Sequence, residues 1–193
     1  MADIRSVCVY CGSSPGPESH KAAATRLGGL LGAAGIRVIY GGGRVGLMGL
    51  TADGALDAGG EVVGIIPGFL DAREVGHPGL TELHIVDSMH ERKQLMFEMA
   101  DAFCILPGGI GTLEETIEVL SWRQLGLHDK PILLIDHEGY WQPFIALLDH
   151  AVASDYARPA HAAALTVLAS VEDVPAALAR APTPRLSGAV IQM

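Results

Sequence analysis

A repeated pattern limits the folds open to this chain more than any other feature. Three short apolar runs, 6–10, 36–40 and 102–106, each end in a glycine-rich turn that leads into a helical pattern. Apolar runs of about 4–8 residues between turn signals are typical of strands buried on both faces. Strands that alternate with helices form a parallel sheet with helices on both faces. The pattern therefore predicts an α/β, Rossmann-like fold, in which ligands bind at the carboxyl ends of the strands.

The same alternation continues along most of the chain. Helices are expected at 17–34, from the glycine turn 41–49 to about 58, and at 88–99, 113–125, 140–152 and 171–181. Further strands are expected at 61–66, 83–86, 132–135 and 165–168. With 193 residues and evenly spread apolar segments, we expect a single nucleotide-binding domain over residues 1–181. Residues 182–193 contain two prolines and no periodicity, which predicts a disordered tail.

Composition and charge exclude several classes of protein. No apolar run approaches the roughly 20 residues that a membrane helix needs, and the first residues do not resemble a signal peptide, so a cytoplasmic protein is expected. The net charge of −9, without a basic run, argues against a nucleic-acid polymer as partner but not against a single nucleotide. Cys8, Cys11 and Cys104 are expected to be buried thiols. The eight histidines lack paired-ligand spacing, so no catalytic metal is expected.

The third glycine turn gives the strongest indication of a binding site. Its sequence, Pro-Gly-Gly-Ile-Gly-Thr at 107–112, precedes a helical pattern. Glycines let backbone N–H groups approach an anion, Thr112 adds a hydroxyl, and a helix N-terminus attracts negative charge. A tight turn with Thr112 as the helix N-cap is the alternative interpretation. Glu115, one helical turn later, is either a capping carboxylate or a group that faces the sugar of a bound nucleotide.

The second glycine turn admits a different interpretation. Gly41-x-Gly43-x-x-Gly46 matches the dinucleotide fingerprint and is followed by a helical pattern. The acidic residue near the expected offset is Glu61, but it begins a predicted strand, whereas a ribose-binding acid is expected where a strand ends. An oxidoreductase that uses a nicotinamide cofactor is therefore a weak alternative.

Two basic residues stand where positive charge is unfavourable. Arg92 and Lys93 lie near the start of a predicted helix, whose dipole disfavours cations there. A bound anion or a nearby carboxylate would offset that cost, and a solvated helix face is the alternative. The irregular segment 71–81, with Arg73, Glu74 and His77, is either functional or a simple connection.

Six short motifs, taken together, resemble one known family. They are C-G-S-S at 11–14, Y-G-G-G at 40–43 with G-L-M-G at 46–49, G-I-I-P at 64–67, M-H-E-R-K at 89–93, P-G-G-x-G-T-x-x-E at 107–115 and W-x-Q-L-G at 122–126. Over about residues 6–155 the chain is similar to the Lonely Guy family. Its members are cytokinin riboside 5′-monophosphate phosphoribohydrolases, often mislabelled as lysine decarboxylases.

The resemblance implies an activity and a state of assembly. An enzyme of this family hydrolyses the N-glycosidic bond of an adenosine monophosphate-type nucleotide, without a cofactor, to free base and ribose 5-phosphate. Family members form homodimers through long helices, with residues of both subunits near the site. A molybdopterin-type or nucleotide carrier on the same scaffold is the alternative from another class.

The resemblance also implies roles for particular residues. It assigns the catalytic pair to Arg92 and Glu115, and a carboxylate beside the anomeric carbon suits an oxocarbenium-like transition state. Two positions depart from the family pattern: Ser121 replaces threonine and His20 replaces an aromatic residue. The expected substrate-binding residues are Gly12, Ser13, Ser14, Gly43, Glu74, Met89, Lys93, Gly108, Gly109, Ile110, Gly111, Thr112, Leu113, Glu114 and Ser121.

Overall fold

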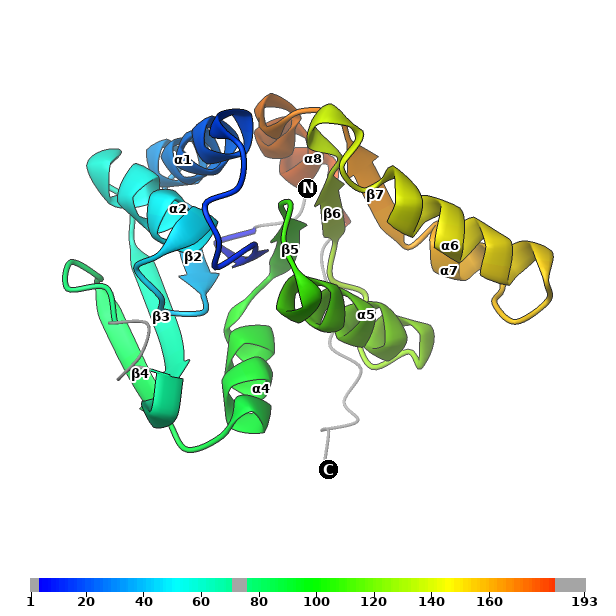
Figure 1. Ribbon diagram of the computed structural model, residues 1–193, viewed down its shortest axis with the longest axis horizontal. Helices are drawn as coiled ribbons and strands as arrows, with labels where there is room; N and C mark the ends of the chain where they lie inside the picture. The colour runs from blue at the N-terminus through cyan, green and yellow to red at the C-terminus, as the bar shows by residue number, and fades with distance from the viewer. Residues whose placement is uncertain (1–3, 71–75, 183–193) are drawn as a thin grey trace.

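One seven-stranded sheet organises the protein. The computed structural model describes residues 4–70 and 76–182, and its strands follow the order β4-β3-β2-β1-β5-β6-β7 (Figure 1). Every neighbouring pair of strands is parallel, which confirms the predicted Rossmann-like α/β fold. The strands are β1 (Ser6–Tyr10), β2 (Arg37–Tyr40), β3 (Val62–Pro67), β4 (Glu82–Val86), β5 (Ala102–Ile105), β6 (Ile132–Ile135) and β7 (Leu165–Leu168).

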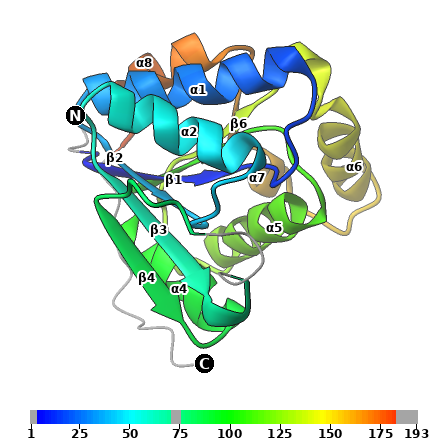
Figure 2. The same ribbon diagram turned by 60° about the vertical axis from the view of Figure 1, so that its left-hand side comes forward.

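Helices cover both faces of this sheet (Figures 1 and 2). One face packs against α1 (Glu18–Ala33), α2 (Gly46–Asp57) and α8 (Val174–Arg180), and the other against α4 (Met89–Met99), α5 (Ile110–Gln124) and α6 (Gln142–Ala153). Alternate side chains of β1 enter different cores, as the period of a strand requires: Val7 and Val9 lie in one, Cys8 and Tyr10 in the other. Shorter elements complete the chain: η1 (His137–Gly139), α7 (Pro159–Ala162) and η2 (Val171–Asp173).

The predicted strands agree with the structure to within about a residue, but several helix starts differ. Helix α5 begins at Ile110 with Gly109 as its N-cap, so the interpretation of Thr112 as the N-cap is wrong. Thr112 lies inside the first turn, because Gly109 adopts the extended conformation that an N-cap needs. The expected helix at 171–181 is divided into η2 and α8, and α7 was not expected. Of the expected tail, residues 183–193 lie outside the described residues.

The chain changes direction across the sheet between β1 and β5. From β1 it proceeds through β2 and β3 to the edge strand β4, and α4 then returns it to β5, beside β1. Ligands of doubly wound sheets bind in the crevice at such a switch point, at the carboxyl ends of the strands. The first and third glycine turns follow β1 and β5, so both lie at this crevice.

Helices α1 and α2 approach each other through glycines. A Cβ added at Gly28 would lie 2.0 Å from the carbonyl oxygen of Thr51, which no real Cβ tolerates. At the adjacent Gly29, the nearest atom would be the carbonyl oxygen of Gly54 at 3.7 Å, an ordinary contact. Neighbouring glycines in one helix therefore have very different tolerance for a methyl group.

We expect Gly28→Ala to lower the free energy of unfolding by about 2–3 kcal/mol, because two helix backbones must separate. Gly29→Ala should leave it unchanged or raise it by up to about 1 kcal/mol, since alanine favours a helix. Urea unfolding followed by circular dichroism measures both variants, each serving as the control for the other. Equal effects of the two substitutions would contradict this account of the helix contact.

None of the described helices is both long enough and apolar enough to cross a bilayer.

Candidate active site

A cavity of about 200 Å³ opens at the carboxyl ends of β1, β2 and β5. Seven of the residues predicted for the site line it: Ser13, Arg92, Gly109, Ile110, Gly111, Thr112 and Glu115. Six lining residues were not predicted: Val9, Cys11, Gly41, Met48, Leu70 and Met96. The cavity therefore joins a polar side, made by the third glycine turn and the Arg92–Glu115 pair, to an apolar side.

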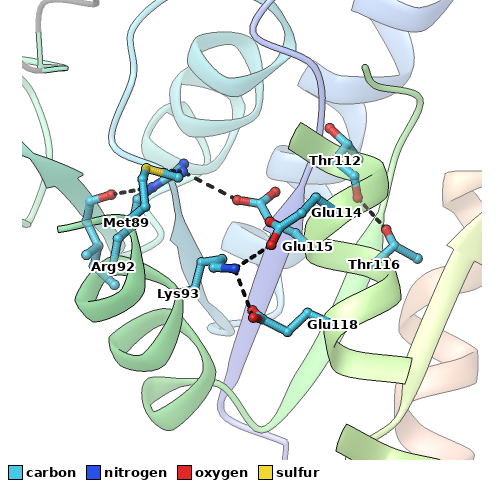
Figure 3. Close-up of polar contacts among 9 residues, drawn as sticks. Met89, Arg92, Lys93, Thr112, Glu114, Glu115, Thr116 and Glu118 are labelled. Atoms are coloured by element: carbon cyan, nitrogen blue, oxygen red, sulfur yellow. Dashed lines mark hydrogen bonds and ion pairs between the residues drawn. The ribbon is translucent and has the colours of Figure 1, made fainter. Parts of the chain in front are cut away.

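Arg92 and Glu115 face each other across elements that are distant in sequence. Arg92 extends from α4, and its Nη1 lies 3.5 Å from Oε1 of Glu115 on α5 (Figure 3). Only 9% of Arg92 and 8% of Glu115 is exposed. Arg92 Nε donates to the carbonyl oxygen of Ile65 at 3.2 Å, and Nη1 lies 3.9 Å from the sulfur of Met89. These contacts fix the plane of the guanidinium, so its charge is held against the carboxylate.

Burial governs the ionisation of Glu115. Loss of hydration raises the pKa of this carboxyl from 4.5 to about 7, while the nearby Arg92 guanidinium opposes the rise and Glu114 adds to it. The folded protein thus favours the neutral form of Glu115. The contribution of this group to the free energy of unfolding is complete below pH 4.5 and is lost as the pH rises through about 7. Glu115 therefore becomes negatively charged as the pH passes through about 7, and in that form it can stabilise a cationic transition state.

The pKa of Glu115 predicts a pH profile. If the ionised carboxylate is the active form, kcat/KM for base release should rise with pH through about 7 and then level off. At pH 5 the value should be about a hundredfold below its plateau, because roughly 1% of the group is then ionised. Initial rates in overlapping buffers between pH 5 and 9 measure this. A profile that falls with increasing pH over this range would show that the neutral acid is the active form.

Gly41 makes room for the guanidinium. A Cβ at this position would lie 2.0 Å from Nη2 of Arg92 and 3.1 Å from its Cζ. The second glycine turn matches a dinucleotide fingerprint, but the contact with Arg92 explains why glycine is needed at its first position. Nothing in the local sequence identifies Arg92 as that neighbour, because the two residues meet only in the folded sheet.

The third glycine turn presents unblocked backbone amides to the cavity. Gly109 is the N-cap of α5, and no side chain caps this helix. Gly108 is packed so closely that an added Cβ would lie 2.1 Å from Oγ1 of Thr112 and 2.9 Å from the backbone nitrogen of Gly12. Gly12 N donates to the carbonyl oxygen of Pro107 at 3.1 Å, which joins the first and third turns. A helix N-terminus that carries glycines and a threonine hydroxyl suits a phosphate group.

Lys93 is held by carboxylates of the protein itself. Its Nζ pairs with Glu114 and, at 2.8 Å, with Oε1 of Glu118, both on α5 (Figure 3). Burial acts to lower the pKa of Lys93, but the hydrogen bonds to Glu114 and Glu118 together raise it above its usual value. Arg92 likewise faces Glu115, so Arg92 and Lys93 both lie against carboxylates. This confirms the expectation that a carboxylate could offset the cost of positive charge near the start of a helix. Neither Lys93 nor Glu114 lines the cavity.

The remaining predicted residues occupy several places. Gly12, Ser14 and Gly108 line a neighbouring cavity of about 390 Å³, which shares Ser13 and Gly109 with the first. Gly43 is buried and forms a bridge with Gly76. Leu113 packs against the core under α5.

The last two predicted residues are Ser121 and Glu74. Ser121 is exposed on α5, nine residues beyond Thr112 and therefore about 13 Å along the helix axis. Glu74 lies outside the described residues, as does Arg73.

The alternative chemistries find little support in the geometry. Glu61 lies just before β3, at the amino end of the strands, and pairs with Arg37 at 2.6 Å, so it cannot reach a ribose at the opposite edge. Cys8, Cys11 and Cys104 are buried free thiols, as expected, and burial raises the pKa of Cys11 and of Cys104 to about 12. Within residues 4–70 and 76–182, no three His, Cys, Asp or Glu side chains gather in a way that could hold a metal ion.

Known proteins resemble this chain in sequence and in fold. A family model described as "Possible lysine decarboxylase" matches residues 48–178. A cytokinin riboside 5′-monophosphate phosphoribohydrolase of Rhodococcoides fascians is 45% identical over 176 residues, which are 90% of this chain and 89% of that protein. The enzyme of the same name from Oryza sativa subsp. japonica is 47% identical over 154 residues, 79% of this chain and 64% of that protein.

Solved structures of other proteins share the fold of this chain. The molybdenum cofactor carrier protein of Chlamydomonas reinhardtii has a TM-score of 0.69 at 20% identity, covering 90% of this chain and 95% of that one; at this identity the likeness concerns the fold alone. The X-ray structure of a structural-genomics target has a TM-score of 0.72 at 26% identity, covering 92% and 99%. The family match and the curated relatives show that this chain belongs to the Lonely Guy family of cytokinin riboside 5′-monophosphate phosphoribohydrolases.

Proposed function

We propose that this protein hydrolyses the N-glycosidic bond of a purine nucleoside 5′-monophosphate, of the cytokinin or adenosine type. Water adds to the anomeric carbon as the bond to the base breaks, and the products are the free base and ribose 5-phosphate. The observation that supports this most is the buried Arg92–Glu115 pair, which lines one cavity with the glycines of an uncapped helix N-terminus. A phosphate site beside a buried carboxylate fits a substrate anchored at one end and cleaved at the other.

Each part of the cavity then has a role in the reaction. The amides at Gly109–Thr112 bind the 5′-phosphate, and this binding energy positions the ribose. The Glu115 carboxylate stabilises the positive charge that develops at the anomeric carbon and orients the attacking water. Arg92 opposes the rise in the pKa of Glu115 and holds its carboxylate in place. The apolar side chains of Met48, Leu70 and Met96 provide a surface for the base.

Release of free base tests the proposal directly. Adenosine monophosphate, isopentenyladenosine monophosphate and adenosine are incubated with the protein, and the products are separated by chromatography. Cleavage of both monophosphates, with adenosine at least about a hundredfold slower, is the expected result, because adenosine lacks the phosphate anchor. The ratio of the two monophosphate rates measures the preference for a prenylated base. Binding of all three without cleavage of any would favour the carrier alternative.

We also propose that the protein is a homodimer formed through α5. Ile110 and Ile117 are 83% and 43% exposed, and with Ser121 they lie on one face of the helix, at spacings of seven and four residues. An exposed apolar face on a helix favours contact with a partner, and a second copy presents a matching face. Such a contact would explain why Ser121 lies outside the cavity of its own chain: it would reach the site of the partner.

We expect Ile117→Glu to convert the dimer to monomers, since a charge in an apolar contact is costly. Light scattering after size-exclusion chromatography measures the mass. Leu147→Glu, at an exposed apolar position on α6, is the matched control and should leave the mass unchanged. Wild-type protein that is monomeric at micromolar concentration would refute the proposed assembly.

A further inference from the structure

The third glycine turn receives a hydrogen bond from a distant part of the chain. Tyr140 follows η1, after the carboxyl end of β6, and its hydroxyl donates to the carbonyl oxygen of Gly108 at 2.6 Å. Tyr140 lines the neighbouring cavity together with Gly108 and Gly109, and it does not line the cavity that contains Arg92 and Glu115. Its hydroxyl therefore contacts the turn from the neighbouring cavity.

The position of this carbonyl fixes the direction of the next amide. In a trans peptide unit the C=O of one residue and the N–H of the following residue point in opposite directions, and no described peptide bond is cis. A hydrogen bond that holds the oxygen of Gly108 toward Tyr140 therefore also holds the N–H of Gly109 pointing away from Tyr140. Gly109 is the N-cap of α5 and lines both cavities, so its N–H is one of the donors available to a phosphate.

The sequence of the turn makes such a restraint necessary. Gly108 and Gly109 stand on both sides of this peptide, and glycine has little steric barrier to rotation of the peptide plane. A rotation of about 180° would turn the φ of Gly109 from −91° to a positive value and would direct the Gly108 oxygen toward a bound anion. The partly negative carbonyl oxygen would then face an oxygen of the phosphate, at a place where a hydrogen-bond donor is needed.

Tyr140 is itself held in place by its neighbours. Its ring meets the ring of His20 edge-on at 5.5 Å and that of Trp141 at 5.0 Å. The backbone N–H of Trp141 donates to Oδ1 of Asp136 at 2.7 Å, which fixes the loop. The departure at His20 keeps a ring at this position, so the support for Tyr140 is retained.

We propose that Tyr140 is a positioning residue, which keeps the Gly108–Gly109 peptide in the orientation that binds the phosphate of the substrate. The proposal rests on the function proposed above, but its first readout, binding of ribose 5-phosphate, does not depend on turnover. The role predicts an effect on affinity for phosphate-bearing ligands and little effect on the chemical step.

Tyr140→Phe tests the role, because it removes only the hydroxyl. We expect the Kd for ribose 5-phosphate, measured by calorimetry, and the KM for adenosine monophosphate each to rise roughly two- to tenfold. The kcat should stay within about twofold of the wild type. Tyr156→Phe, at a tyrosine that is 90% exposed, is the matched control and should change neither constant. An unchanged Kd in Tyr140→Phe would overturn the proposal.

A second variant separates peptide orientation from a general loss of structure. Alanine at Gly109 fits the observed φ, and its Cβ would meet nothing within 4 Å, but it disfavours the positive φ of the rotated peptide. Adding Tyr140→Phe to Gly109→Ala should therefore change the Kd by less than twofold. An equal loss in both backgrounds would overturn the proposal. A wild type that binds ribose 5-phosphate but releases no base would refute the proposed function alone.

Discussion

Replacing Glu115 with glutamine is expected to lower the kcat for base release by roughly 10²–10⁴-fold, the range found when an essential acid or base is removed. Glutamine has almost the same shape, so the cavity and the packing of α5 should be unchanged. It cannot acquire a negative charge, however, and stabilisation of the oxocarbenium-like transition state is lost. The KM should change little, because the amides that bind the phosphate remain in place.

Glu118, on the same helix, provides a control for this experiment. Glu118→Gln removes a carboxylate that pairs with Lys93 and does not line the cavity. This variant should retain kcat to within about threefold of the wild type, since only one partly buried ion pair is changed. A Glu115→Gln variant with more than a tenth of the wild-type kcat would remove Glu115 from the catalytic role.

Replacing Arg92 with alanine should lower kcat/KM at pH 7 by roughly a hundredfold or more. Without the guanidinium, the opposing influence on the Glu115 carboxyl is gone and its pKa rises above the value of about 7 that it has in the wild type. The carboxyl then stays neutral instead of becoming an unpaired buried charge, so the variant should fold. Part of the activity should return at pH 9, which measurements between pH 6 and 9.5 would reveal. Arg92→Lys should not restore the rate, because lysine cannot contact Ile65 and Glu115 together.

Gly41→Ala offers an independent route to the same defect. The added methyl group would lie 2.0 Å from Nη2 of Arg92, so the guanidinium must move although both charges remain. We expect a loss of kcat/KM of at least tenfold, with circular dichroism unchanged. An Arg92→Ala variant with wild-type kcat/KM and an unshifted pH profile would show that the arginine serves the fold only.

The parallel sheet could be predicted from the sequence for a simple physical reason. Strands such as β1 and β5 are buried on both faces, so their residues form uninterrupted apolar runs, and the glycine turns mark their ends. The same turns identified one edge of the sheet as the ligand edge, and the cavity lies there. Local sequence was sufficient because each of these features depends on residues adjacent in the chain.

The features that could not be predicted depend on contacts between distant elements. Intrinsic propensity placed the start of α5 after Gly111, whereas the structure begins the helix at Ile110 and includes this glycine. The partners of Lys93 became apparent only once α4 and α5 lay together on one face of the sheet. Likewise, neither Gly41 nor Tyr140 carries a local signal of its role, since each acts on a residue about 30 or more positions away.

The position of the candidate active site at the switch point has a consequence for synthesis of the protein. Val7 in β1 pairs with Ala102 in β5, and at about 5–20 residues per second the ribosome completes that partner several seconds after β1. Until then β1 has only β2 beside it, with an open edge on its other side. Arg92 and Glu115 come from α4 and α5, on either side of β5 in the chain. No amino-terminal fragment that ends before β5 can therefore contain the pair, and the proposed catalytic pair is complete only after the nascent chain has closed its sheet at the centre.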